Sequence, residues 1–209
     1  MDIARIAELL GPYTAEVGPP PALLEQLQRY LDLLLRWNAR VNLTAVRNPE
    51  EIVTRHFGES LFAARILLDD SRRSASLADV GSGAGFPGIP IKVFAPEFAL
   101  TLIEPHNKKA TFLREVIRTL QLDRADAFCG RAEQWGKTAD LVTLRAVEQF
   151  ERSLPSAAAR VAAGGKLCLL IGAGQIPTAQ KILGAGWRWE EPMLVPESRG
   201  RVVVVGTRS

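Results

Sequence analysis

The sequence predicts an α/β protein whose core is a doubly wound, mostly parallel sheet preceded by a helical segment. Before about residue 70 the apolar residues recur at the three- and four-residue intervals of helices, and after it short apolar runs alternate with helical stretches. A glycine-rich turn follows the first of these runs. Strands that alternate with helices form parallel sheets, and such sheets bind ligands at the carboxyl ends of their strands.

The N-terminal part is predicted to be helical. Pro20-Pro21 suits the first turn of a helix, and the apolar positions that follow are Leu23, Leu24, Leu27, Tyr30, Leu31, Leu34 and Leu35. A second helix is predicted to begin at Asn48-Pro49-Glu50-Glu51, with Asn48 as N-cap and Glu51 placed for a capping box. Helices are then expected to run through Ile52 and Leu61 to Leu68.

Seven strands are predicted in the second part of the chain. They are Leu77 to Val80, Leu100 to Glu104, Ala125 to Cys129, Leu141 to Leu144, Leu167 to Ile171, Trp187 to Leu194 and Arg201 to Gly206. Between the second and third strands, residues 107–120 carry one apolar helical face. Only a short link precedes the last strand, so we expect that strand to return antiparallel.

A boundary between the helical pattern and the alternating strand and helix pattern is expected at residues 69–74. It divides the chain into a helical domain, 1–70, and a sheet domain, 71–209. The net charge of +3 is unevenly distributed. Residues 1–70 hold seven basic and ten acidic residues, or −3, and residues 71–209 hold nineteen and thirteen, or +6. A basic sheet domain could attract a polyanion such as nucleic acid, although a merely solvated basic surface gives the same count.

Membrane, secreted and metal-binding proteins do not fit the composition. The apolar runs are far too short to cross a bilayer, and Asp2, Arg5 and Glu8 interrupt the place where a secretory signal needs an apolar core. Cys129 and Cys168 form no CxxC pair and lie in predicted strands, so both are expected to be buried core residues. With two histidines besides, no metal site is expected. We therefore expect a cytoplasmic monomer.

The glycine-rich turn at residues 79–88 reads Asp-Val-Gly-Ser-Gly-Ala-Gly-Phe-Pro-Gly. Gly81, Gly83 and Gly85 permit positive φ and leave no side chain between the backbone and a ligand. Residues 83–88 match the G-x-G-x-x-G spacing of dinucleotide enzymes, in which a pyrophosphate lies on the helix N-terminus. A nicotinamide or flavin enzyme is therefore one interpretation, and a purely structural turn is another.

A third interpretation is a methyltransferase that uses S-adenosylmethionine. Asp79, just before the glycines, could face the ammonium group of this cofactor directly or through water. Glu104 ends the second strand, 23 residues after Gly81, and its carboxylate can accept both ribose hydroxyls. Dinucleotide sites usually keep the position of Asp79 apolar, so this residue favours methyl transfer.

The chain also resembles a known family over nearly its whole length. In the helical part the matching motifs are Trp37-Asn38, Asn42-Leu43-Thr44, Glu51, His56 and Glu59-Ser60-Leu61, with Glu59 where aspartate is usual. In the sheet part they are residues 79–90, Lys108-Lys109, Phe112-Leu113, Gly130-Arg131-Ala132-Glu133 and Arg145-Ala146-Val147. Their order and spacing resemble the bacterial 16S ribosomal RNA guanine-N7 methyltransferases, also called the glucose-inhibited division protein B family.

This resemblance implies a Rossmann-like class I methyltransferase with a seven-stranded sheet and an N-terminal helical extension. Its cofactor would be S-adenosylmethionine, and its product 7-methylguanosine in 16S ribosomal RNA, either free or in the small ribosomal subunit. The implied cofactor residues are Asp79, Gly81, Ser82, Gly83, Phe86, Glu104, Ala132, Glu133 and Arg145, and Arg145 would also position the base. The candidates for RNA contact are Arg72, Arg73, Lys108, Lys109 and Arg131.

The implied chemistry demands little of the side chains. Guanine N7 carries an exposed lone pair, so its methylation needs in-line placement but no general base, and no catalytic nucleophile is expected. Trp37 and His56 are expected to pack the helical part onto the sheet. Pro105, Leu144 and Ile171 depart from the family pattern, the last standing where lysine is usual. The alternatives are a methyltransferase for another RNA, a protein or a small molecule, and a non-catalytic RNA-binding ribosome-assembly factor.

Overall fold

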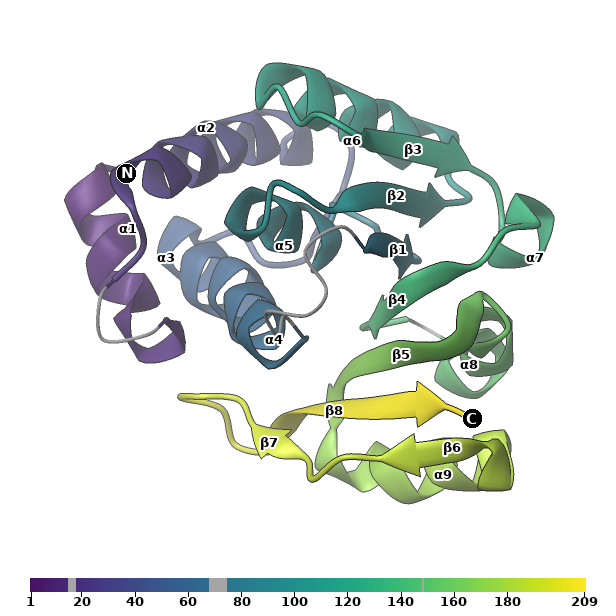
Figure 1. Ribbon diagram of the computed structural model, residues 1–209. Helices are drawn as coiled ribbons and strands as arrows, with labels where there is room; N and C mark the ends of the chain where they lie inside the picture. Colours follow the sequence, from purple (N-terminus) through teal and green to yellow (C-terminus); the bar gives the residue numbers. More distant parts are fainter. Residues whose placement is uncertain (15–17, 68–74, 148) are drawn as a thin grey trace.

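The computed structural model describes residues 1–14, 18–67, 75–147 and 149–209. Its first part is helical, with α1 (Ile3–Leu10), α2 (Pro21–Asn38), α3 (Pro49–Ile52) and α4 (Glu59–Leu67), and a 3₁₀ turn, η1, at Gly11–Tyr13. Figure 1 shows these helices beside an α/β unit that contains the sheet and the helices that follow β1 in the chain. The predicted class, an α/β fold with an N-terminal helical extension, is confirmed.

The predicted helix starts are confirmed. α2 begins at Pro21 and buries the apolar stripe that the spacing indicated. At α3, the side chain of Asn48 accepts hydrogen bonds from the backbone of Glu50 and Glu51. The carboxylate of Glu51, expected to complete a capping box, pairs with Arg55 at 3.2 Å. One feature was not predicted: residues Val53–Gly58, η2, form a π-helical turn between α3 and α4.

The sheet has the predicted doubly wound topology. In the described ranges its strands are β1 (Ser76–Val80), β2 (Ala99–Glu104), β3 (Ala125–Cys129), β4 (Ala139–Arg145), β5 (Val161–Gly172), β6 (Trp187–Trp189), β7 (Met193–Leu194) and β8 (Arg201–Arg208). The order is β3-β2-β1-β4-β5-β8-β6, with β7 also on β8. The first five strands are parallel, and β8 runs antiparallel to β5. β8 is also antiparallel to β6 and β7, which precede it in the chain, as the short link indicated.

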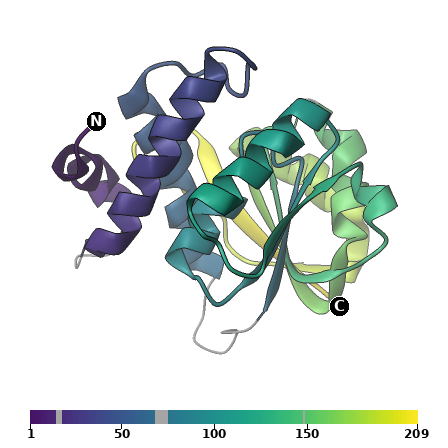
Figure 2. The ribbon, with the colours of Figure 1, turned by 90° about the horizontal axis from the view of Figure 1, so that it is seen from above.

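Helices cover both faces of this sheet. They are α5 (Gly88–Phe94), α6 (Asn107–Thr119), α7 (Ala132–Trp135), α8 (Phe150–Ala158) and α9 (Ile176–Leu183), with 3₁₀ turns η4 (Ala173–Gln175) and η5 (Gly184–Gly186). Alternate residues of a strand point to opposite faces. In β5, Cys168 and Leu170 pack with α5, α6 and the N-terminal helices, whereas Leu167 and Leu169 pack with α8 and α9. Figure 2 shows the N-terminal helices on one side of the sheet.

Three expectations need correction or lie beyond the described residues. The predicted strand from Trp187 to Leu194 is two strands, β6 and β7, and Pro192 between them has no N–H to donate to a ladder. Cys129 is exposed rather than buried, because β3 is an edge strand, whereas Cys168 is buried as predicted. The boundary at residues 69–74 and the predicted helix end at Leu68 lie outside the described residues, so the division of the chain at residue 70 stays a prediction.

Candidate active site

The carboxyl ends of four parallel strands meet at one edge of the sheet. Val80 of β1, Glu104 of β2, Cys129 of β3 and Arg145 of β4 all end there, because the strands are parallel and in register. The glycine-rich turn leaves β1 at this edge and leads into α5. The sequence therefore brings most of its candidate residues to one place, as the fold class predicted.

The backbone of the glycine turn needs its glycines. Gly81, Gly83 and Gly85 have φ of 71°, 57° and 95°. A Cβ at Gly83 would meet no atom closer than 3.9 Å, so this part of the turn is open. A Cβ at Gly81 would lie 3.0 Å from Val147, which crosses from the end of β4. The turn thus presents bare backbone toward the strand ends.

Glu104 ties the glycine turn to the end of β2. Its Oε2 accepts a hydrogen bond from the Gly83 N–H at 2.8 Å, and its Oε1 accepts one from the His106 N–H at 2.8 Å. Only 3% of the residue is exposed. Because an ionised carboxylate has about four acceptor sites, two such bonds leave capacity for hydroxyl donors. The ribose role of Glu104 stays a prediction that this geometry permits.

Asp79 lies beneath the turn and is completely buried. Its Oδ1 accepts a hydrogen bond from the Thr143 hydroxyl at 2.7 Å, and its Oδ2 accepts one from the Gly88 N–H at 3.2 Å. Ser82 donates its hydroxyl to the Asp79 carbonyl at 2.8 Å. Burial raises the pKa of Asp79 to about 6, against the effect of these donors. Asp79 therefore fastens the turn to α5 and β4, and its contact with a cofactor ammonium stays a prediction.

The N-terminal helices reach the turn through an aromatic cluster. The ring of Phe86 stacks on His56 with centroids 4.8 Å apart and lies 5.4 Å from Tyr30. The Tyr30 hydroxyl donates to the carbonyl of Ala84. Phe86, predicted to line the cofactor, is 7% exposed and serves in this packing. The packing role predicted for His56 is thus confirmed, and Trp37 likewise lies against Phe112 of α6, at 5.6 Å.

A cavity of about 290 Å³ opens beside the glycine turn. Its lining includes three of the predicted cofactor residues, Gly81, Ala132 and Glu133, and one predicted RNA contact, Arg131. The α8 side chains Arg152, Ser153 and Ser156 also line it. The sequence reasoning missed α8, whose internal Pro155 obscures its helical pattern. The Ser156 hydroxyl donates to the Glu133 carboxylate, and this bond lowers the pKa of Glu133.

A second cavity, of about 340 Å³, shares Val147 with the first. Its walls include four charged side chains: Arg55, Glu59, Arg145 and Arg201. Ile171, where the resemblance led us to expect a lysine, is also in this wall. A basic residue is nevertheless close by, because Arg201 of β8 pairs with Gly172 in the adjacent strand.

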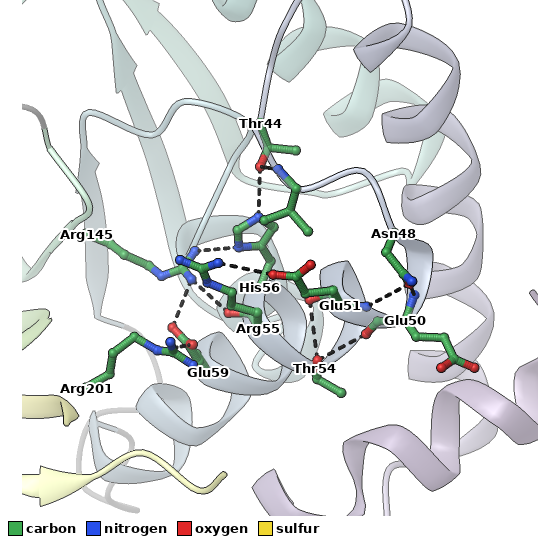
Figure 3. Close-up of polar contacts among 11 residues, drawn as sticks. Thr44, Asn48, Glu50, Glu51, Thr54, Arg55, His56, Glu59, Arg145 and Arg201 are labelled. Atoms are coloured by element: carbon green, nitrogen blue, oxygen red, sulfur yellow. Dashed lines mark hydrogen bonds and ion pairs between the residues drawn. The ribbon is translucent and has the colours of Figure 1, made fainter. Parts of the chain in front are cut away.

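Arg145 joins β4 to the π-helical turn, as Figure 3 shows. Its Nη2 donates to the Arg55 carbonyl at 2.8 Å and to Glu59 Oε2 at 2.9 Å. Its Nη1 lies 3.1 Å from His56 Nδ1. Its side chain is 9% exposed, and burial lowers its pKa while Glu59 opposes the shift. Arg145 therefore holds the helical part against the strand ends, and its predicted contact with a base stays a prediction.

The contacts of His56 define its protonation. Arg145 Nη1 can only donate, so Nδ1 is the acceptor and Nε2 carries the hydrogen. Nε2 then donates to the Thr44 hydroxyl at 3.0 Å. Burial, followed by the charges of Arg145, Arg55 and Arg201, lowers the pKa of His56 to about 3. The ring is therefore neutral at physiological pH.

The predicted RNA-contact residues lie partly at the same edge. Lys108 and Lys109 are in the first turn of α6, directly after β2, and Arg131 follows β3 with its side chain exposed. Arg72 and Arg73 lie outside the described residues. None of the helices in the described ranges is long and apolar enough to cross a membrane. Nor do three or more His, Cys, Asp or Glu side chains gather as a metal site would, as far as the chain is described.

A glycine turn after β1 and an acid at the end of β2, at the carboxyl edge of a sheet ordered 3-2-1-4-5-8-6, define a class I methyltransferase. The sequence model of one family within this class, described as rRNA small subunit methyltransferase G, matches residues 23–180. The chain belongs to this family. The family resemblance and the enzyme class predicted from the sequence are confirmed.

Two relatives illustrate the similarity, both named Ribosomal RNA small subunit methyltransferase G. The protein of Stenotrophomonas maltophilia is 37% identical over 201 residues, which are 94% of this chain and 92% of the relative. That of Chloroflexus aggregans is 37% identical over 195 residues, 88% of this chain and 81% of the relative.

Solved structures support the fold at low sequence identity. The ribosomal protein L11 methylase of Lactobacillus delbrueckii subsp. bulgaricus has a TM-score of 0.60 at 12% identity, covering 75% of this chain and 79% of the other. The P. horikoshii protein TYW2, solved in complex with MeSAdo, has a TM-score of 0.56 at 19% identity, covering 73% and 61%. The predicted class I fold is confirmed.

Proposed function

We propose that this protein transfers the methyl group of S-adenosylmethionine to N7 of a guanosine in 16S ribosomal RNA. The observation that carries the proposal is the pair of cavities that meet at Val147, one beside the glycine turn and one between β4, β8 and the π-helical turn. A methyl donor in the first and a base in the second would be neighbours. Membership of the methyltransferase family and the printed names of its relatives support the choice of reaction and RNA.

The residues beside the first cavity fit the cofactor. Gly81 and Gly83 offer backbone without side chains, and Glu104 has acceptor capacity left for ribose hydroxyls. Ala132 leaves room for a flat ring, and Glu133 lies at the rim. When bound, S-adenosylmethionine supplies an electrophilic methyl group on a positively charged sulfur. These residues would orient that group and limit the access of water.

The reaction asks the chain for positioning rather than proton transfer. The N7 lone pair attacks directly, so the contribution of the protein is to align base and methyl group, which can account for several kcal/mol of the barrier. Arg145 is suited to border the base, because three contacts fix its guanidinium in the wall of the second cavity. No nucleophile or general base is required of the site.

The basic side chains at the strand edge suit an RNA backbone. Arg131 lines the cofactor cavity, and Lys108 and Lys109 are in the first turn of α6. These three side chains would neutralise phosphates near the target nucleotide. We propose 16S ribosomal RNA, free or in the small subunit, as the partner, and a cytoplasmic monomer as the working form. Binding that weakens steeply with salt would follow from such contacts.

Calorimetric titration with S-adenosylmethionine tests the cofactor, with NAD as the control ligand. Wild type should bind the former and not the latter. Gly81→Val should abolish binding, because it adds a branched side chain at φ 71° and against Val147. Gly174→Val, at an open position with no atom within 4 Å of a Cβ, is the matched control. Binding of NAD alone would overturn the cofactor assignment.

Methyl transfer itself is measured with a labelled methyl group on 16S ribosomal RNA and on small subunits that lack the modification. The product is cleaved at 7-methylguanosine to locate the nucleotide. Label at one guanosine N7 is the expected result. Cofactor binding without transfer to either substrate would favour another acceptor, and RNA binding without cofactor would favour an assembly factor.

A further inference from the structure

The second cavity contains a buried carboxylate that is incompletely satisfied. Glu59 is 2% exposed, and its Oε2 is bonded to Arg145. Its Oε1 lies 2.6 Å from Arg201 Nε, yet among the described residues neither atom has a hydrogen-bond partner, so this contact is one of charge with poor hydrogen-bond direction. The Oε1 atom is thus held by an ion pair alone, and Glu59 is in the wall of the cavity. The position therefore suits a donor group from a ligand.

The donor that fits best is the Watson–Crick edge of guanine. A carboxylate accepts two parallel N–H bonds from a planar fork, as it does from arginine. Guanine carries such a fork in its N1–H and its 2-amino group, which together form a neutral counterpart of the guanidinium of Arg201. The corresponding edges of adenine, cytosine and uracil each place at least one acceptor there, which a carboxylate would repel.

The placement agrees with methylation at N7. N7 and the Watson–Crick edge lie on opposite sides of the purine, so a base held through that edge turns N7 away from Glu59. The cavity that holds Glu59 shares Val147 with the cavity of the glycine turn. Arg201 can yield its position, because 41% of its side chain is exposed, whereas Arg145 is 9% exposed and tied by three contacts.

We propose that Glu59 is the residue that selects guanine at this site. It accepts N1–H and the 2-amino group of the target base, which displaces the guanidinium of Arg201 from Oε1. This inference rests on the proposed function and adds to it the part of the base that is read. Glu59 therefore acts in specificity, in addition to its pairing with Arg145.

The test compares guanosine with inosine, which lacks only the 2-amino group. The methylated guanosine is first mapped in the wild-type product. Two 16S RNAs are then assembled by ligation, with guanosine or inosine at that one nucleotide, and kcat/KM for methyl transfer is measured on each. Wild type should prefer guanosine about tenfold or more, the worth of one hydrogen bond to a charged group.

Two variants separate selection from structural support. Glu59→Gln should lower kcat/KM for the guanosine RNA and reduce the preference to about twofold or less, because an amide cannot accept both bonds. The control is Glu51→Gln. Glu51 is an exposed carboxylate that pairs with Arg55, and its loss should leave the wild-type preference for guanosine unchanged. Binding of S-adenosylmethionine, measured calorimetrically, reports whether each variant is folded.

The outcomes are distinct. Absence of methyl transfer by wild type refutes the proposed function and this inference with it. Transfer with equal rates on guanosine and inosine RNA refutes the inference alone, and this result needs no variant. A preference that survives intact in Glu59→Gln also refutes it, and would leave Glu59 only its pairing with Arg145. A preference lost in Glu59→Gln and kept in Glu51→Gln supports it.

Discussion

Replacement of His56 by glutamine should change how the stability of the protein depends on pH. The imidazole is buried, accepts a hydrogen bond from Arg145 and stacks on Phe86. Burial, and after it the guanidinium that a proton on Nδ1 would face, lower the pKa of His56 from 6.5 to about 3. The unfolded chain therefore binds a proton between pH 3 and 6.5 that the native state does not, and stability falls as the pH decreases through this window.

The size of the effect follows from the unfolded histidine. At pH 7 about a quarter of the unfolded rings carry the proton, and at pH 5 nearly all do, so His56 should cost about 2 kcal/mol of unfolding free energy over these two units. The native pKa of about 3 lies well below this range, so the folded protein stays unprotonated at His56 throughout it. Glutamine can still donate to Thr44 but does not titrate.

Urea unfolding followed by circular dichroism at pH 5, 6 and 7 measures the difference. The unfolding free energy of wild type should fall about 2 kcal/mol more than that of His56→Gln between pH 7 and 5. Thr44→Val keeps the buried ring and removes one partner, so its pH dependence should follow wild type. Parallel curves for wild type and His56→Gln would refute a neutral buried His56.

Three further substitutions give separate tests. Tyr30→Phe removes the donor to the Ala84 carbonyl, and the Kd for S-adenosylmethionine, measured by calorimetry, should rise about three- to tenfold. An unchanged Kd would show that this contact of α2 with the glycine turn does not support cofactor binding. Burial raises the pKa of Asp79 from 3.8 to about 6, so the native state holds the extra proton and stability falls as the pH rises through this window, by up to about 3 kcal/mol. Asp79→Asn should lack this fall in urea titrations from pH 4 to 7, and its persistence would contradict the assignment. Gly85→Ala places a Cβ against Ile89 Cδ1 and 2.7 Å from the Tyr30 hydroxyl oxygen, at φ 95°. It should lose about 2 kcal/mol or more of unfolding free energy, whereas Gly174→Ala should change it by less than about 1 kcal/mol.

The architecture could be predicted because its signals are local. The apolar spacing of α2, the cap at Asn48 and the strand–turn–helix pattern around the glycines each depend on a few neighbouring residues. The split between β6 and β7 was missed because Trp187, Trp189, Met193 and Leu194 resemble one apolar run, although Glu190-Glu191-Pro192 separates the two halves. The prediction that Cys129 is buried was wrong, because the residues of a strand do not reveal that the strand forms an edge of the sheet.

The site was predicted in outline and missed in its connections. Position at the end of a strand located Glu104 and Arg145, because parallel strands share an edge. Glu59 and Arg201 lie 142 positions apart in the sequence, and no spacing rule joins them to Arg145. The family motifs include Glu59 but gave it no role in the site, and Arg201 gave no signal beyond a basic residue at the start of a strand.

The π-helical turn has a consequence for how this protein tolerates change in length. The turn holds one residue more than an α-helical path would, and the same stretch offers Arg145 the carbonyl of Arg55 and the ring of His56. Deletion of a single residue from Val53–Gly58 would let the helix close up as α, because the wider turn is what accommodates the extra residue, and α3 and α4 would keep their relative direction. The residues inside the turn would be re-spaced, so the Arg55 carbonyl and the His56 ring could no longer both meet Arg145. A deletion here should therefore leave the fold intact and remove the contacts that hold Arg145.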